Sequence, residues 1–220
     1  MKRKIIVTGD GSKTIQIEDW DEQYHSKHGA IQEAYHVFME HGLRLFQNSE
    51  IHVLEIGFGT GLNALITLLE APKQHLRIHY VGVEAYPVTL EEVGHLDYCH
   101  QLKAEDSEEL FRLMHQSHWE ESVSVTDAFH LLKQKKDFRE IKDLNKFNLI
   151  YFDAFGARVQ PDLWTEDIFK IMYEALVQGG VLVTYAAKGS VRRAMQAVGF
   201  TVERLPGPPG KREMLRAVKN

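Results

Sequence analysis

From Ile51 onward, short apolar runs alternate with longer segments whose apolar residues recur every three or four positions. The short runs have the length of buried strands, and the longer segments have the period of amphipathic helices. This alternation is typical of an α/β domain with a parallel, doubly wound sheet. The strands are expected over residues 51–55, 76–84, 122–126, 147–152 and 181–185. Between them, helices are expected over 61–70, from Pro87, over 105–116, from Pro161 until Gln178–Gly180 ends it, and over 189–198.

Both ends of the chain carry patterns that this alternating unit does not need. Residues 4–8 and 14–18 flank a Gly-Asp-Gly-Ser turn and predict a β-hairpin, which a helical pattern over 31–38 follows. Residues 200–205 and 213–218 predict a closing antiparallel hairpin. The chain therefore divides into an N-terminal extension, residues 1–48, and an α/β domain, residues 49–220. The highly charged stretch 133–146 is expected to be a solvated helix or loop.

The turn between the first strand and the first helix of the domain contains Gly57, Gly59 and Gly61. A dinucleotide-binding fingerprint would need Gly or Ala where Leu62 stands, and a P-loop would need a Gly-Lys-Ser/Thr ending. The remaining pattern over residues 55–63, E-x-G-x-G-x-G, resembles motif I of the class I S-adenosyl-L-methionine (SAM) methyltransferases. A tight strand-to-helix turn without a ligand would be the alternative.

Carboxylates follow or end the first four expected strands: Glu55, Glu84, Asp127 and Asp153. Ligands of open α/β sheets bind beyond the carboxyl ends of the strands, and four acids gathered there need donors or cations. SAM offers an ammonium, a sulfonium, two ribose hydroxyls and an adenine amine. Glu84 is placed to accept the ribose hydroxyls, and Asp127, with Ala128 beside it, to accept the adenine amine. Each acid by itself could instead cap the following helix.

Asp153 differs from the other acids because aromatic and small residues surround it in Tyr-Phe-Asp-Ala-Phe-Gly. Methyl transfer to an amine requires a neutral nitrogen in line with the methyl carbon and the sulfur. A carboxylate can accept an N–H bond from that amine and take up its proton, and aromatic faces can stabilise a cationic methyl donor. We therefore expect Asp153 to be the catalytic residue. A helix cap or an ion pair with Arg158 is the alternative.

Composition narrows the compartment and the partners. The chain is 44% hydrophobic and 26% charged, which is ordinary for a globular protein, and no apolar run reaches membrane-spanning length. Cys99 is the single cysteine, so no intrachain disulfide can form, and a cytoplasmic location is expected. Two His-x-x-His pairs lack further ligands, so no metal is expected. The net charge is −5, yet residues 188–220 hold eight basic and two acidic residues, which predicts contact with phosphates.

Five segments of the sequence together resemble the MnmC-type tRNA methyltransferases. They are residues 55–63, 83–87, 152–155, 160–165, and 191–193 together with 211–215. The resemblance extends from about residue 20 to the C-terminus, and its Pro-Asp-Leu-Trp-Thr and Lys-Arg-Glu-Met-Leu blocks are more specific than motif I. It implies a class I SAM-methyltransferase fold and conversion of 5-aminomethyl-2-thiouridine to 5-methylaminomethyl-2-thiouridine at the tRNA wobble position.

The resemblance also implies roles for individual residues. The SAM contacts would be Tyr24, Glu55, Gly57, Phe58, Gly59, Gly61, Asn63, Glu84, Asp127 and Ala128. The aminomethyl group would be received by Asp153 and Phe155. The anticodon arm of the tRNA would be met by Lys188, Arg192, Arg193, Lys211 and Arg212.

Many members of this family carry a second, FAD-dependent oxidase domain, for which this chain has no room. We therefore expect a separate enzyme to supply the aminomethyl-uridine, or an upstream pathway to make it directly. Two other functions remain open at this stage. One is methyl or aminopropyl transfer to a small-molecule amine on the same fold, and the other is a non-catalytic RNA-binding module.

Overall fold

A small three-stranded sheet begins the chain in the computed structural model, which describes residues 2–220. Its antiparallel strands lie in the order β1-β2-β3, with bounds β1 Arg3–Val7, β2 Lys13–Ile17 and β3 Glu22–Gln23. The predicted hairpin over 4–8 and 14–18 is confirmed, and β3 is an addition to it. Helix α1, Ala30–Ala34, follows and continues as a π-helical turn, Tyr35–Glu40.

The main sheet has the strand order β10-β11-β9-β8-β4-β5-β7-β6. Its five central strands, β9 to β7 in this order, are parallel, and antiparallel strands complete both edges. The bounds are β4 Glu50–Ile56, β5 Arg77–Val83, β6 Ser122–Thr126, β7 Phe129–Gln134, β8 Phe147–Phe152, β9 Leu176–Thr184, β10 Phe200–Pro206 and β11 Glu213–Lys219. The predicted α/β class and mostly parallel, doubly wound sheet are confirmed.

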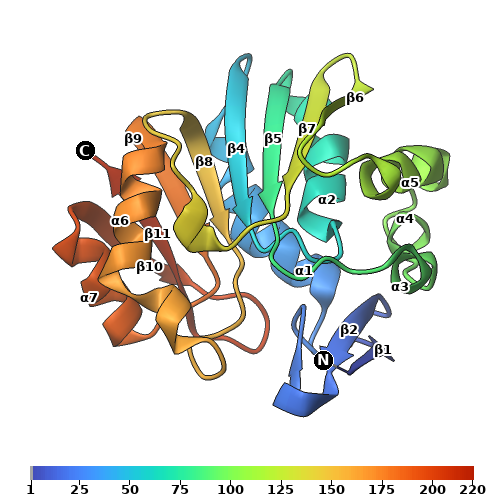
Figure 1. The fold of residues 1–220 in the computed structure, drawn as a ribbon, viewed down its shortest axis with the longest axis horizontal. Coiled ribbons are helices and arrows are strands. Elements are labelled where there is room, and N and C mark those ends of the chain that lie inside the picture. The colour runs from blue at the N-terminus through green and yellow to red at the C-terminus, as the bar shows by residue number, and fades with distance from the viewer. Residues whose placement is uncertain (1) are drawn as a thin grey trace.

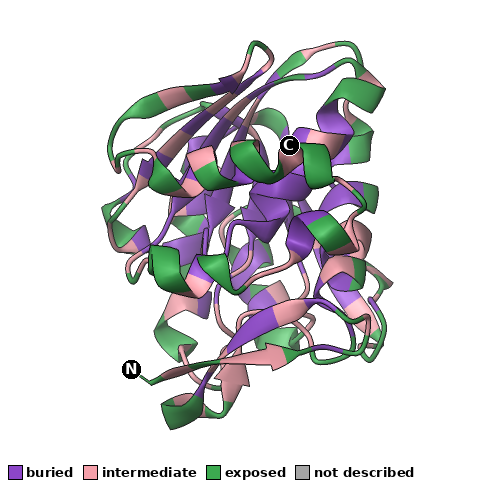
Figure 2. Ribbon diagram, turned by 90° about the vertical axis from the view of Figure 1, so that its right-hand side faces the viewer, coloured by how far each residue is buried: buried purple, intermediate pink, exposed green. Residues whose placement is uncertain are grey.

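Helices cover both faces of this sheet (Figure 1). Their bounds are α2 Leu62–Glu70, α3 Leu90–Gly94, α4 Tyr98–Gln101, α5 Glu108–Gln116, α6 Glu166–Ala175 and α7 Gly189–Ala197. Short 3-10 turns lie at Glu18–Trp20, Leu43–Leu45, Ala71–Gln74, Glu105–Ser107, Phe138–Glu140 and Pro161–Trp164. One hydrophobic cluster packs α1, α2 and α5 on one face, and a second packs α6 and α7 on the other. Figure 2 shows the buried residues concentrated on the strands between these layers.

The chain order within the sheet reverses between β4 and β8. From β4 the strands proceed to β5 and β7 on one side, and β8 and β9 lie on the other. Such a switch point leaves a crevice at the carboxyl ends of the two strands, because the connections leave in opposite directions. Glycine loop 57–61 follows β4, and Asp153 follows β8. The fold therefore brings these two segments of the chain together.

The prediction for residues 122–134 is wrong in its topology. Strand β6 is an antiparallel edge strand, and the parallel neighbour of β5 is β7, which was not predicted and whose last two residues fall in the stretch 133–146 expected to be a charged helix or loop. The alternating burial of residues 129–134 is the signal of this strand. Lys133, in this strand, is buried. Its Nζ donates a hydrogen bond to the main-chain oxygen of His115, 2.7 Å away, at the end of α5, which offsets the cost of burying the amine.

Two other element boundaries differ from the prediction. Helix α3 begins after Thr89 rather than at Pro87, because Thr89 and Glu92 form a reciprocal capping box. Residues 178–180 do not end a helix but lie inside β9, where the pairing with β8 shifts register. Gly179 has a φ of +76° there, which is the left-handed conformation that such an irregularity requires.

The N-terminal segment is packed against the main domain. Ala30, Ala34 and Phe38 belong to the same hydrophobic cluster as β4, β5 and α2. The division of the chain at residue 48 stays a prediction. Among residues 2–220, no helix is long and apolar enough to cross a bilayer, and no group of three or more His, Cys, Asp or Glu side chains is arranged to hold a metal ion.

Candidate active site

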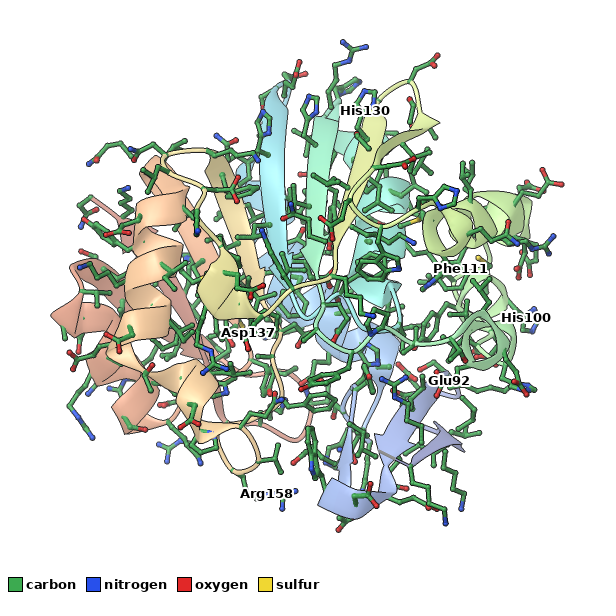
Figure 3. All side chains as sticks on the ribbon, viewed as in Figure 1. Glu92, His100, Phe111, His130, Asp137 and Arg158 are labelled. Carbon is green, nitrogen blue, oxygen red and sulfur yellow. The ribbon has the colours of Figure 1, made fainter. Side chains whose placement is uncertain are left out.

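A cavity of about 650 Å³ lies at the carboxyl ends of β4, β5 and β8. Its walls come from the glycine loop, the N-terminal segment 20–28, residues 137–139, the loop 153–163 and the hairpin turn at 210–211. In Figure 3 the labelled Asp137 lies toward the lower ends of the strands, on the turn beside α6, and the labelled His130 lies at their upper ends. The cavity therefore occupies the switch-point crevice and is closed on one side by the N-terminal segment.

The glycine loop touches both the acid after β8 and the N-terminal segment. Gly57 has a φ of +90°, and a Cβ atom on it would lie 2.8 Å from the main-chain oxygen of Asp153. Gly59 has a φ of +49°, and a Cβ on it would lie 2.9 Å from the ring of Tyr24. Side chains at these positions would push the loop away from both partners. The glycines thus allow close packing within the protein as well as room for a ligand.

Asn63, in the first turn of α2, joins two of the predicted acids. Its Nδ2 donates to Oε1 of Glu55 and to Oδ2 of Asp153, each at 2.9 Å. The hydroxyl of Tyr80 donates to the other oxygen of Glu55 at 2.8 Å. The Oδ1 atom of Asn63 is buried and has no hydrogen-bond partner among the described residues. Because a buried acceptor is costly to leave unpaired, this oxygen points to a ligand that donates an N–H or O–H.

Burial disfavours the ionised form of three acids in the cavity. Burial raises the pKa of Glu55 well above its usual range. Burial, and next the negative charge of Glu33, raise the pKa of Asp153 to about 7. Burial also raises the pKa of Glu84, although three main-chain N–H groups, those of Tyr86, Gly59 and Ala85, oppose the shift. A ligand that carries positive charge into the cavity would offset these shifts and favour the ionised acids.

Glu84, directly after β5, links the glycine loop to the segment that connects β5 to α3. Its two carboxylate oxygens accept the main-chain N–H groups of Gly59 at 3.1 Å and Tyr86 at 2.9 Å. Arg3 of β1 fixes that connection from outside by donating to the main-chain oxygens of Tyr86, at 2.6 Å, and Pro87, at 3.2 Å. Glu84 lines the cavity, and its carboxylate can accept the ribose hydroxyls of a ligand bound there.

Aromatic side chains form the wall nearest to Asp153. The ring of Phe155 meets the edges of Trp20 and Tyr24, with centroids 5.6 and 5.0 Å apart. Arg158 ties this loop to the N-terminal segment by donating to the carboxylate of Glu22 at 2.6 Å. The sequence-based alternative, an ion pair between Arg158 and Asp153, is therefore wrong, because Arg158 turns toward the N-terminal segment instead.

Most of the predicted cofactor residues are brought together. The predicted residues that line the cavity are Tyr24, Glu55, Gly57, Phe58, Gly59, Asn63, Glu84, Asp153, Phe155 and Lys211. Gly61 lies at the start of α2, between the lining residues Thr60 and Leu62. The lining residues that the sequence did not identify are chiefly Trp20, Glu22, Glu33, Asp137, Arg139 and Tyr185.

Asp127 and Ala128 are not part of this cavity. They form the turn between β6 and β7, at the amino ends of the parallel strands. Ile78, at the start of β5, donates its main-chain N–H to the main-chain oxygen of Ala128. The expectation that Asp127 ends a strand at the glycine loop is therefore wrong. The acid that follows the correct parallel strand is Asp137, which lines the cavity and accepts the side chain of Arg139 at 2.7 and 2.8 Å.

The predicted basic residues divide into two groups. Lys188, Arg193 and Arg212 are exposed, and Arg192 is half-buried. Lys211 instead lines the cavity, where its ammonium pairs with the carboxylate of Glu33. Lys211 therefore differs from the other predicted basic residues, because its ammonium already has an internal partner.

The hydrogen-bond acceptors of the cavity fit SAM in two respects. The acids Glu55, Glu84 and Asp153 match the ammonium, sulfonium and ribose hydroxyls of that molecule in charge and hydrogen bonding. The buried Oδ1 of Asn63 can accept a further N–H. The residues that would hold the molecule are thus those of the glycine loop together with Glu84 and Asn63.

Comparison with known proteins gives the same chemistry. A family model described as S-adenosyl-L-methionine-dependent methyltransferase matches residues 97–220. The tRNA 5-methylaminomethyl-2-thiouridine biosynthesis bifunctional protein MnmC of Aromatoleum aromaticum is 31% identical over 228 residues, covering 97% of this chain and 35% of the relative. The protein of the same name from Hydrogenovibrio crunogenus is 29% identical over 213 residues, covering 89% and 31%. The chain thus spans about a third of the length of these relatives.

Solved structures agree with this comparison. The crystal structure of MnmC2 from Aquifex aeolicus superimposes with a TM-score of 0.77 at 26% identity, covering 100% of this chain and 70% of that one. Spermidine synthase from Thermotoga maritima has a TM-score of 0.60 at 16% identity, covering 100% and 75%. The second likeness shows a shared fold alone.

Proposed function

The chain belongs to the S-adenosyl-L-methionine-dependent methyltransferase family, and from this we propose that it methylates a primary amine on tRNA. The acceptor in this proposal is the 5-aminomethyl group of 2-thiouridine at the wobble position, and the product is its 5-methylaminomethyl form. The observation that carries the proposal is the single hydrogen-bonded cluster of Asp153, Asn63 and Glu55 beside the glycine loop. The names of the relatives support the substrate.

When bound, SAM supplies a methyl carbon that accepts the lone pair of the amine, while the carbon–sulfur bonding pair stays on sulfur and the alkylated nitrogen releases one proton. Glu84 and the main chain of the glycine loop hold and orient the donor in this proposal. Glu55 and Asn63 offer acceptors for its ammonium group. Aligning the amine nitrogen with the methyl carbon and the sulfur supplies the largest part of the rate enhancement, because the methyl group is already activated.

Asp153 acts on the amine. Its carboxylate accepts an N–H of the incoming amine, which orients the nitrogen lone pair away from the acid and toward the donor. A pKa of about 7 suits this residue to take the proton that the nitrogen releases, since a base works best when its pKa is near the working pH. The aromatic wall of Trp20, Tyr24 and Phe155 shields the reaction from water and offers ring faces to a base or a cation.

The tRNA partner rests on charge as well as on the relatives. Lys188, Arg193 and Arg212 are exposed on a part of the chain with net positive charge, and phosphate contacts need such groups. A cytoplasmic location and a separate source of the aminomethyl-uridine belong to the same proposal.

Methyl transfer from labelled SAM to bulk tRNA from cells lacking this protein tests the proposal. We expect label in 5-methylaminomethyl-2-thiouridine after nucleoside digestion, and its rate of appearance should fall by a factor of about 10² to 10⁴ with the Asp153→Asn variant. SAM binding is measured in parallel by calorimetry on both proteins. Tight SAM binding without label in tRNA, but with transfer to a small amine such as putrescine, would replace the tRNA substrate by a small molecule. SAM binding without transfer to any amine would leave a non-catalytic module.

A further inference from the structure

Lys211 occupies a different environment from the other basic residues near the C-terminus. Its Nζ pairs with the carboxylate of Glu33 and lies 3.8 Å from the centroid of the Tyr185 ring. The hydroxyl of Tyr185 in turn donates to the main-chain oxygen of Ala154 at 2.8 Å, next to Asp153. The ammonium is therefore held on two sides, at the wall of the cavity that contains Asp153.

Glu33 is fixed independently of this lysine. It is buried in α1, and its second carboxylate oxygen accepts the main-chain N–H of Ser26 at 3.0 Å. Glu33 and Lys211 are separated by 178 positions in sequence, so their pairing joins the N-terminal helix to the C-terminal hairpin. A solvated lysine that served phosphates alone would have no need of a buried carboxylate partner.

The electrostatic surroundings of Asp153 come from every element that packs around it. Burial, and next Glu33 from α1, raise its pKa, whereas Asn63 from α2 and Lys211 from the hairpin turn lower it. The other ionisable groups of this wall are Glu55 on β4, Tyr80 on β5 and Tyr185 after β9, with Glu84 and Glu22 further along the cavity. Lys211 is the one cation among these groups that acts directly on Asp153.

We propose that Lys211 and Glu33 are positioning residues that set the charge at the amine side of the cavity, and that Lys211 is not a tRNA contact. The lysine favours the carboxylate form of Asp153 and disfavours an ammonium form of the incoming amine. Glu33 keeps the lysine at that place and limits its effect. The proposal rests on the proposed amine methylation, but its electrostatic part concerns this chain alone.

The two residues of this pair have opposite charges, which gives the proposal a sharp signature. Removing the positive charge in Lys211→Met leaves Asp153 with acidic neighbours, so its midpoint of titration rises. Removing the negative charge in Glu33→Gln takes away a like charge, so the midpoint falls. A purely structural ion pair would behave differently, because breaking it from either side would disturb Asp153 in the same way.

The first measurement is the carboxyl ¹³C chemical shift of Asp153 in the SAM-free protein labelled with [¹³C]aspartate, assigned with Asp153→Asn. We expect a midpoint near 7 in the wild type. The midpoint should move by about one pH unit upward in Lys211→Met and downward in Glu33→Gln. Lys211→Arg should stay near the wild type. Shifts in the same direction for both charge-removing variants, or no shift in Lys211→Met, would overturn the proposal whether or not the protein methylates tRNA.

The second measurement compares Lys211→Met with its exposed neighbour, Arg212→Met, in the methyl-transfer assay. We expect Lys211→Met to move the acidic limb of the kcat/KM profile to higher pH and to leave the salt dependence unchanged. Arg212→Met should raise the KM for tRNA and reduce the salt dependence, with the acidic limb unmoved. If Lys211→Met instead behaves as described for Arg212→Met, Lys211 is a phosphate contact. A wild type without transfer would refute the proposed function, while the titration would still decide the electrostatic part.

Discussion

Asp153→Asn should raise the stability of the protein while it lowers methyl transfer, because the carboxylate that the proposed chemistry uses is costly to bury. The folded protein raises the pKa of Asp153 from 3.8 to about 7. Between these pH values the unfolded chain releases the proton while the folded chain keeps it, so wild-type stability falls as pH rises through this window. A difference of this size corresponds to about 4 kcal/mol, which contact with solvent in the open cavity reduces to about 2 kcal/mol.

The neutral amide removes this penalty without changing the shape of the side chain, and its oxygen can still accept the N–H of Asn63. We therefore expect Asp153→Asn to be more stable than the wild type above pH 7 by about 2 kcal/mol, with the gain shrinking as the pH falls toward 4. Methyl transfer should fall by a factor of about 10² to 10⁴, the usual contribution of a positioned base.

Urea unfolding of both proteins at several values between pH 5 and pH 8 measures the gain, and labelled SAM measures the transfer. Asp127→Asn is the matched control, because that exposed carboxylate lies in the turn between β6 and β7, outside the cavity, and its loss should not reproduce the gain of Asp153→Asn. A constant gain across the pH range would show that folding does not raise the pKa of Asp153, and a loss of stability at pH 8 would show that the folded protein favours the carboxylate. Either result would refute this reasoning.

Three other substitutions test the remaining parts of the site. Glu84→Gln should weaken SAM binding by about tenfold in calorimetry, since one charged acceptor is lost, and unchanged affinity would remove Glu84 from the donor site. Asp127→Ala should keep SAM affinity within about twofold of the wild type, because the residue lies outside the cavity; a marked loss would contradict the strand order at β7. Gly59→Ala should lower both stability and SAM affinity, because its φ of +49° and the ring of Tyr24, 2.9 Å from the added Cβ, leave no room. Thermal unfolding and calorimetry check this, and wild-type behaviour in both would show that the loop can move.

Features that depend on neighbouring residues in the chain were predictable. The apolar run before Gly57, the three glycines and the acid in the run specify a strand, a turn and a helix within a short segment, so the glycine loop, Glu55 and Asn63 were identified. Asp153 and Glu84 were found for the same reason, because each directly follows a buried apolar strand. The structure places all of these at one cavity, as a doubly wound sheet requires of strand ends near its switch point.

Pairing between strands and contacts between distant segments required the tertiary structure. The sequence predicted a strand over 122–126 but missed the one over 129–134. Only the pairing of the strands shows that the first is antiparallel and that Asp137, not Asp127, reaches the cavity. Likewise, the sequence shows Lys211 as one charge in a basic segment, whereas folding places it against Glu33, 178 residues away. The sequence by itself therefore determined most of the strands and helices, and which acids directly follow a strand. The tertiary structure decided which charges meet, because that depends on long-range packing that no local pattern encodes.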